Sequence, residues 1–428
     1  MISTLRSTVC IVAFILSIPA IACDFDTVEL TTGARATGTI RSYSGRDVVI
    51  DVKIGTRTFQ RRYPKDRVKA IIHDGKRIDL RTGKATEPSS GGRVERSREE
   101  VIAEIDRLGK VQPDWYESTP LNYPKTLDLS WPMPAPKPWN GSKNVGQFIW
   151  ERINPNANKW REGVRFMHHI LSTTKNNDVR QRAMRSLGSM YHNLLQDYAR
   201  SAFWFRLSGL ENQLADAPQQ GIALADCYWK LGSKRMALET LAKMKRKPYS
   251  AIKLLGDLGE TDAAVKLGEA FAKSGQASTS FLYAGDACRV AGRLDDAEKY
   301  YRRAIAGIPK AEASKPHRKR DKARAEASIA AIKFYSLDPK KVRDGKYSAS
   351  SIGYEAPVRV EVVVKAGTIE SVKVTQHREK QYYSSLTDTP RKILARQGVS
   401  GIDATSSATI TSEAIINATA KALADGSK

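Results

Sequence analysis

Near its C-terminus the 428-residue chain reads Asp403-Ala404-Thr405-Ser406-Ser407-Ala408-Thr409-Ile410-Thr411-Ser412, directly before an apolar stretch. That stretch has the spacing of a helix, through Ile415, Ile416, Ala420 and Leu423. Backbone N–H groups without a partner and the positive end of the helix dipole meet at a helix N-terminus, where they attract an anion such as phosphate. Hydroxyl side chains add donors, but the same pattern also suits an ordinary N-cap. From the residues alone, both a phosphate site and a plain helix start remain open.

Two strands and a further helix are expected before this stretch. Val358, Val360, Val362 and Val364 alternate with polar residues, which predicts a half-buried strand. A turn at Ala366-Gly367 leads to a second strand, and Thr389-Pro390 predicts a helix that starts with proline at its first position. Residues 338–428 are therefore predicted to form an α+β domain.

Residues 345–424 resemble the FMN-binding domain found in one subunit of the sodium-pumping NADH:quinone reductase and in its counterpart in the related Rnf electron-transport complex. The resemblance rests on the β-hairpin, on the Ser/Thr-rich motif and on the Glu-Ala-Ile-Ile-Asn-Ala helix that follows it. The family motif reads Asp-x-x-Ser/Thr-Gly-Ala-Thr, and its last Thr carries the flavin phosphate; here that residue is Thr409. Ser407 stands where the family usually has Gly, so a positive φ at this position would strain the backbone.

This resemblance implies a covalent cofactor. FMN would be esterified to Thr409 by a separate exported flavin transferase, which uses FAD and Mg²⁺, and Asp403 would matter to that transfer. The flavin phosphate and ribityl chain would be lined by the other residues of the motif: Ser406, Ser407, Ala408, Thr411 and Ser412. The carrier interpretation requires these hydroxyls to border a cavity that can hold a three-ring cofactor.

Residues 146–337 have helical periodicity throughout. The most regular segment, from Phe281 to Pro309, has the spacing of a tetratricopeptide repeat, with small residues where two helices approach closely. Two weaker copies surround Gly188 and Gly232, a partial hairpin surrounds Gly259, and residues 318–335 are expected to form a final capping helix. We predict an all-α tetratricopeptide-like domain, which could dock a partner protein on a concave face or act as a rigid spacer.

The N-terminal half of the chain is predicted to contain a small β domain and a linker. Short alternating apolar runs separated by glycines predict a compact β-barrel of the SH3-like or Sm-like type in residues 24–82. Residues 83–145 are predicted to be a proline-rich linker with one short helix near 98–108, because Ser97 and Glu100 form a capping box.

The first residues have the pattern of a secretory signal. Arg6 precedes an apolar run from Val9 to Ile21, which predicts a signal peptide in residues 1–22. Cleavage before Cys23 and lipid attachment to Cys23 both remain open. We expect an exported protein, periplasmic or membrane-anchored on the extracytoplasmic side. The net charge of +24 favours anionic surroundings, but export argues against nucleic acid as a partner.

Two functions from different classes follow from these patterns. The first is an extracytoplasmic flavoprotein that exchanges electrons with a membrane or periplasmic redox partner through FMN. It would be a carrier rather than a complete oxidoreductase, because the chain has no Gly-x-Gly-x-x-Gly fingerprint, no Cys-x-x-Cys-His haem motif and no cysteine cluster. The alternative is a tetratricopeptide-type envelope adaptor whose flavin fold does not bind flavin.

Overall fold

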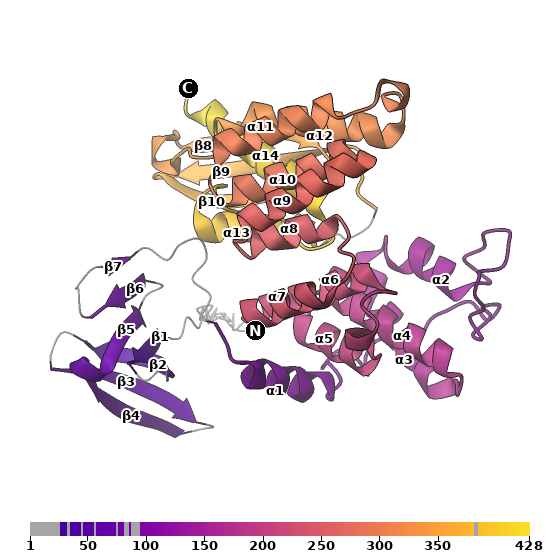
Figure 1. Cartoon of the computed structure of the whole chain (residues 1–428), viewed down its shortest axis with the longest axis horizontal. Coiled ribbons are helices and arrows are strands. Elements are labelled where there is room, and N and C mark those ends of the chain that lie inside the picture. The colour runs from indigo at the N-terminus through magenta and orange to yellow at the C-terminus, as the bar shows by residue number, and fades with distance from the viewer. Residues whose placement is uncertain are drawn as a thin grey trace, which may run out of the picture. The chain divides into compact units, whose positions relative to one another are not determined.

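The computed structural model describes residues 26–31, 35–43, 46–54, 57–73, 76–80, 85–86, 95–380 and 384–428. The chain divides into two compact units, Met1–Gly92 and Arg93–Lys428 (Figure 1), and each is described by itself. The predicted signal peptide and the lipidation candidate Cys23 lie outside the described residues. Within the ranges given above, no helix is long and apolar enough to cross a membrane.

The first unit is a small antiparallel sheet. Its strands are β1 Asp26–Leu30, β2 Arg35–Ser42, β3 Asp47–Ile54, β4 Arg57–Pro64, β5 Val68–His73, β6 Lys76–Asp79 and β7 Ala85–Thr86, with the 3₁₀ turn η1 at Lys65–Arg67. Their order is β4-β3-β2-β1-β5-β6-β7, and the inward side chains of Val28, Val48, Ile50 and Ile71 form its core. The strands expected from the alternating pattern are present. The closed barrel is not: among the described strands, β4 and β7 are the outer ones and do not pair with each other.

The second unit begins with a long all-helical region. Its main helices are α1 Arg98–Gly109, α2 Val145–Phe148, α3 Trp160–Thr173, α4 Asn177–Met190, α5 Tyr198–Leu207, α6 Pro218–Lys230, α7 Lys234–Lys243, α8 Ser250–Asp257, α9 Thr261–Phe271, α10 Ala277–Val290, α11 Leu294–Ala306 and α12 Pro316–Ile332. Short 3₁₀ or π turns lie between them, at η2 Ile149–Ile153, η3 Ala157–Lys159, η4 Tyr191–Leu195, η5 Leu210–Asn212, η6 Ala272–Gln276, η7 Lys310–Glu312 and η8 Pro339–Lys341. The capping box predicted at Ser97 and Glu100 is formed, and α1 packs against α5.

Consecutive helices in this region form hairpins, as the spacing of small residues predicted. Gly232, Gly259 and Gly292 have positive φ angles at the turns between α6 and α7, α8 and α9, and α10 and α11. Gly285 on α10 allows close approach of α11, because a Cβ there would lie 2.6 Å from the ring of Tyr301. The all-helical nature of the region is confirmed, whereas its assignment to the tetratricopeptide family stays a prediction.

The C-terminal part of the second unit combines a three-stranded antiparallel sheet with two helices. The strands are β8 Gly345–Ile352, β9 Pro357–Lys365 and β10 Thr368–Gln376, in the order β10-β9-β8. The valines predicted to alternate on β9 all point inward, and Ala366-Gly367 forms the turn to β10 with both φ angles positive. The α+β arrangement is therefore the one expected.

The two helices of this part are α13 Ser385–Arg396 and α14 Thr409–Gly426. The predicted helix start at Thr389-Pro390 was wrong, because α13 begins at Ser385, five residues before Pro390, and contains Pro390 in its interior. The amide of Asp388 donates to the carbonyl of Ser384 at 2.8 Å, and the buried side chains of Asp388 and Thr389 are held by neighbouring segments. These tertiary contacts offset the hydrogen bond that Pro390 cannot donate.

Helix α14 is the buried helix of the C-terminal part. It packs on β8 and β9 on one side and on α12 and α13 on others, so that its side chains are buried almost throughout (Figure 1). The apolar residues of α10, α11 and α12 and those of the C-terminal sheet belong to one continuous core. The helical region and the C-terminal part therefore fold against each other. The start of α14 faces α8 and α10 of the helical region.

Candidate functional site

The segment from Asp403 to Ala408, which we call the Ser/Thr loop, leads into α14 at Thr409. Ser407 has a φ of +62° and an exposed side chain at the tip of the loop. The helix then begins, with the amide of Ser412 donating to the carbonyl of Ala408 at 3.0 Å. The position where the family motif usually has glycine thus adopts the left-handed conformation that glycine favours.

Three hydroxyls of the motif donate to buried carboxylates. Thr405 Oγ1 donates to Asp388 Oδ2 at 2.7 Å, Ser406 donates to Asp226, and Thr411 donates to Glu379. Each hydroxyl has a single proton to donate. In this arrangement Thr405, Ser406 and Thr411 therefore have no proton left for a phosphate oxygen.

Ser412 is also part of this hydroxyl network. Its side-chain oxygen accepts the amide of Thr405 at 3.0 Å and the hydroxyl of Thr389 at 3.1 Å. These bonds tie the loop to the first turn of α14 and to α13. Ser412 has the structural role of holding the loop backbone in its turn.

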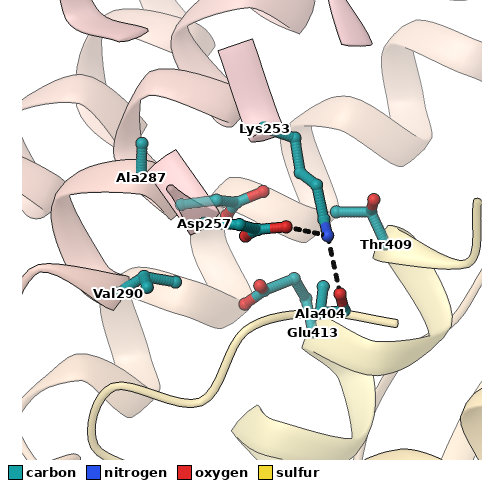
Figure 2. A pocket seen from close by; sticks show the side chains of 8 residues that line it. Lys253, Asp257, Ala287, Val290, Ala404, Thr409 and Glu413 are labelled. Carbon is teal, nitrogen blue, oxygen red and sulfur yellow. Dashed lines mark hydrogen bonds and ion pairs between the residues drawn. The ribbon is translucent and has the colours of Figure 1, made fainter. Parts of the chain in front are cut away.

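Thr409 differs from its neighbours. Its side chain is almost buried, with 8 % of the residue exposed, yet Thr409 Oγ1 forms no hydrogen bond within the described part of the chain. It borders a pocket together with Lys253, Ala287 and Val290 (Figure 2). Thr409 is therefore the buried hydroxyl of the motif that forms no hydrogen bond among the described residues, and it is covered by side chains of α8 and α10. The Ser407 hydroxyl forms none either, but it is exposed.

Three lysines surround the start of the loop. Lys230 Nζ lies 2.8 Å from Asp403 Oδ2, and Lys392 Nζ lies 3.3 Å from Asp403 Oδ1. Burial alone would raise the pKa of Asp403, but Lys230 and Lys392 outweigh it and hold this pKa well below its usual range. Lys253 Nζ donates to the carbonyl of Ala404 at 2.7 Å and also pairs with Asp257 (Figure 2). The carboxylate of Asp403 is thus ionised, and each of its two oxygens pairs with a lysine.

A buried arginine of α10 links the residue before the loop to the first turns of α14. Arg289 Nη2 donates to the carbonyl of Ile402 at 2.9 Å and to Glu413 Oε1 at 2.6 Å. Both side chains are only 1 % exposed. Burial is the main influence on the Glu413 carboxyl and raises its pKa to about 7, although Arg289 opposes this shift.

The pocket beside Thr409 does not fit FMN as the side chains are arranged. The space in it that a water-sized sphere can enter is about 10 Å³, enough for about one water molecule and far below the size of pockets that hold cofactor-sized molecules. Three carboxyl groups and one ammonium line it, those of Asp257, Asp286, Glu413 and Lys253. This lining does not favour a phosphate, and the volume does not admit three fused rings. The cavity required by the carrier interpretation is therefore not formed beside Thr409 in this arrangement.

Comparison with known families places this loop in context. Residues 353–424 match the FMN-binding domain family. The matched range includes the sheet from its second strand onward, both C-terminal helices and the whole Ser/Thr loop. The FMN-binding domain predicted at the C-terminus is thereby confirmed, and it makes FMN a possible cofactor.

Relatives add little to this family match. An uncharacterized protein of Treponema pallidum (strain Nichols) is 34% identical over 93 residues, which are 21% of this chain and 26% of that protein. The similarity thus spans about a quarter of the relative's length. No solved structure matches the chain significantly.

The structure brings the predicted site residues into one loop and its following turn, but it also adds residues that the sequence reasoning missed. Asp226 and Lys230 on α6 and Lys253 on α8 contact the loop from outside the FMN-binding domain, and Arg289 on α10 contacts Ile402 directly before the loop. One signal in the sequence was available: Asp226 lies within the otherwise uncharged run from Gly221 to Trp229. A charged side chain in a buried helix needs a hydrogen-bonding partner, and one partner of Asp226 is the hydroxyl of Ser406 in the loop.

Proposed function

We propose that this protein is an extracytoplasmic electron carrier whose FMN is attached to Thr409 of its FMN-binding domain. Two features of the Ser/Thr loop and the helix that follows it together carry the proposal. The backbone has the left-handed residue at position 407 that the family motif expects, and the next helix starts on a threonine whose hydroxyl has no partner among the described residues. The hydroxyls of Thr405, Ser406, Thr411 and Ser412 are engaged in hydrogen bonds. Of the two that are not, Thr409 stands where the family motif has the threonine that carries the flavin phosphate.

Attachment would be carried out by a flavin transferase. In that reaction Thr409 Oγ would bond to the flavin phosphorus as the pyrophosphate bond of FAD breaks, AMP would leave, and the hydroxyl proton would pass to a base of the transferase. When bound, the isoalloxazine supplies the redox chemistry. The residues of this chain hold the attachment point: the N-terminus of α14 fixes the backbone of Thr409, and Ser412 fixes the loop before it.

The proposal is tested by attachment itself. The full chain is co-expressed with a flavin transferase, purified and denatured, and its mass and flavin absorbance are measured. We expect one FMN per chain that stays bound after denaturation, loss of this FMN in Thr409→Ala, and retention in Thr409→Ser, which keeps the hydroxyl. Flavin that is released on denaturation indicates noncovalent binding, and equal labelling of Thr409→Ala places the attachment elsewhere.

A second function is favoured by the covered state of the loop. If the protein is an envelope adaptor, its flavin fold serves as a packing module for the helical region, and the helical face binds a partner protein. The small pocket and the burial of Thr409 are the observations in its favour. Colourless protein without added mass after co-expression, compared with a relative that is labelled under the same conditions, would decide for the adaptor.

The location and redox partners of the protein belong to the same proposal. The signal-like N-terminus and the net charge of +24 support export and an anionic partner or surface. We propose a membrane or periplasmic redox protein as the electron-transfer partner.

A further inference from the structure

A proline-rich strap, residues 131–139, precedes α2 at the surface of the helical region (Figure 1). Trp131 holds its first end, because this residue is only 5 % exposed. The guanidinium carbon of Arg182 lies 5.3 Å from the centre of the Trp131 ring, and Arg182 also donates to the Trp131 carbonyl. At the other end of the strap, Trp139 Nε1 donates to the carboxylate of Glu151 on η2. The strap is therefore fixed to the helical region at both ends.

The strap and η2 present large apolar side chains to solvent. Met133 is 64 % exposed, and Trp139 is 59 % exposed although its ring N–H is bonded to Glu151. Trp150, directly before Glu151 on η2, is 51 % exposed. We call these three residues the Trp patch. Single exposed apolar residues are normal on a protein surface, but several on one strap and the turn that it contacts indicate an interaction site.

The charges around the Trp patch favour an anionic partner. Lys137 lies within the strap, Lys143 follows it, and Arg152 lies on η2; all three are exposed. None of them forms an ion pair with another of the described residues. Two carboxylates nearby in the chain, those of Asp128 and Glu151, accept hydrogen bonds from neighbouring side chains. The cations of this surface are therefore available to bind anionic groups of a partner.

The backbone of the strap also suits the boundary between lipid and water. A backbone N–H that leaves water without finding a partner costs free energy. Every second residue from Pro132 to Pro138 is proline, which has no N–H to lose. Tryptophan is enriched at membrane interfaces because its ring is apolar while its N–H is polar, and Lys and Arg bind anionic headgroups. The strap and η2 combine these three properties.

From these features we propose that the Trp patch docks the protein on the surface of an anionic lipid bilayer. The two indole rings and Met133 enter the headgroup region, and Lys137, Lys143 and Arg152 contact the lipid phosphates. No residue of the patch lies within residues 353–424, which match the FMN-binding domain family. The inference therefore does not depend on flavin attachment, and its failure would leave the proposed function standing.

The test measures vesicle binding and the site of contact separately, with the full-length chain. Vesicles contain phosphatidylglycerol and phosphatidylcholine in equal amounts, and vesicles of phosphatidylcholine alone are the reference. Co-sedimentation gives the partition coefficient, and lipids brominated in their acyl chains quench the fluorescence of tryptophans that enter the bilayer. Trp139→Ala combined with Trp150→Ala removes both rings. Leu207→Ala is the apolar control, because Leu207 on α5 is 55 % exposed.

We expect the chain to prefer the anionic vesicles and to be quenched on them. The double Trp variant should bind about tenfold more weakly, which equals about 1.4 kcal/mol, and should lose the quenching, whereas Leu207→Ala should change neither. Lys137→Gln should weaken binding about fivefold, as expected for one cation near an anionic surface. Lys322→Gln, whose exposed pair with Glu326 lies on α12, is its control and should bind as the unmodified chain does.

Two further points keep the comparison clear. All variants share the same first residues, so any membrane affinity of the predicted signal peptide or of a lipid at Cys23 is common to them. The substituted side chains are exposed, so equal melting temperatures are expected and show that the variants fold. Trp150→Ala alone keeps the contact between Trp139 and Glu151, and it provides a second variant should the double variant fail to fold.

Each outcome gives a decision. Equal binding to vesicles with and without phosphatidylglycerol overturns the anionic part of the proposal. Binding without bromolipid quenching, or quenching that persists in the double Trp variant, overturns the Trp patch as the point of contact. A chain that leaves vesicles unbound but forms dimers, which the double variant does not form, overturns membrane docking and makes the patch a contact between two copies.

Discussion

Replacing Ser407 by glycine should stabilise the Ser/Thr loop. A non-glycine residue in the left-handed region costs about 1–2 kcal/mol, and Ser407 has a φ of +62°. Its side chain is exposed and forms no hydrogen bond in the described part of the chain, so that nothing is lost with it. Glycine loses more backbone entropy on folding, by about 0.5–1 kcal/mol, which leaves a net gain of about 0.5–1 kcal/mol for Ser407→Gly.

Two further variants separate the backbone from the hydroxyl. Ser407→Ala keeps the Cβ and the positive φ, so its stability should equal that of the unmodified chain. Ala366→Gly removes the same kind of conformational cost at another exposed position, where φ is +48°, and should give a similar gain. The change in stability of Ala366→Gly therefore measures the cost of a positive φ at a position far from the motif.

Thermal unfolding and hydrogen exchange of residues 403–408 measure the effect. We expect Ser407→Gly to raise the melting temperature of the second unit by about 1–3 °C and to slow exchange in the loop. A lower melting temperature for Ser407→Gly, or a gain in Ser407→Ala as large as that in Ser407→Gly, would refute the backbone argument. In the second case the hydroxyl, and not the φ angle, would be the unfavourable feature.

Three further predictions concern residues that hold the site in place. Burial would raise the pKa of Asp388, but neighbouring cations lower it to about 2, so its contribution is present above about pH 4 and is lost as the pH falls toward 2. Asp388→Asn should therefore cost about 2 kcal/mol in urea unfolding at pH 7 and almost nothing near pH 2; a cost independent of pH would contradict this. Arg289→Met should cost about 3–5 kcal/mol, because it leaves Glu413 buried without its cation, and adding Glu413→Leu should recover most of that loss; a double variant no more stable than Arg289→Met would contradict the pairing. Gly285→Ala should lower stability by about 1–3 kcal/mol in the same assay, because its Cβ would overlap the buried ring of Tyr301, and an unchanged midpoint would show that the two helices can separate without cost.

Local patterns in the sequence determined much of the second unit. Alternating valines predicted β9, the Ala366-Gly367 pair predicted its turn, and the Ser97–Glu100 box predicted α1 within one residue of its end. The Ser/Thr motif predicted a helix start, which the structure places at Thr409. These features depend on neighbours a few residues apart, and such short-range preferences can be read directly from the chain.

Long-range pairing decided the features that were predicted wrongly or missed. Whether the N-terminal strands close into a barrel depends on a pairing between β4 and β7, which no local pattern encodes. The start of α13 was misplaced because a proline is compatible with a helix interior when tertiary contacts hold the preceding turn.

The sequence by itself determined that a hydroxyl-rich loop of the FMN-binding type precedes the last helix, because a motif is a property of adjacent residues. Only the tertiary structure decided what that loop touches. Asp226 and Ser406 are 180 positions apart in the chain, and Arg289 and Ile402 are 113 apart. Their contact exists because α10 shares a core with α14, while α8 packs on α10 and contacts α6, and this packing is what covers Thr409.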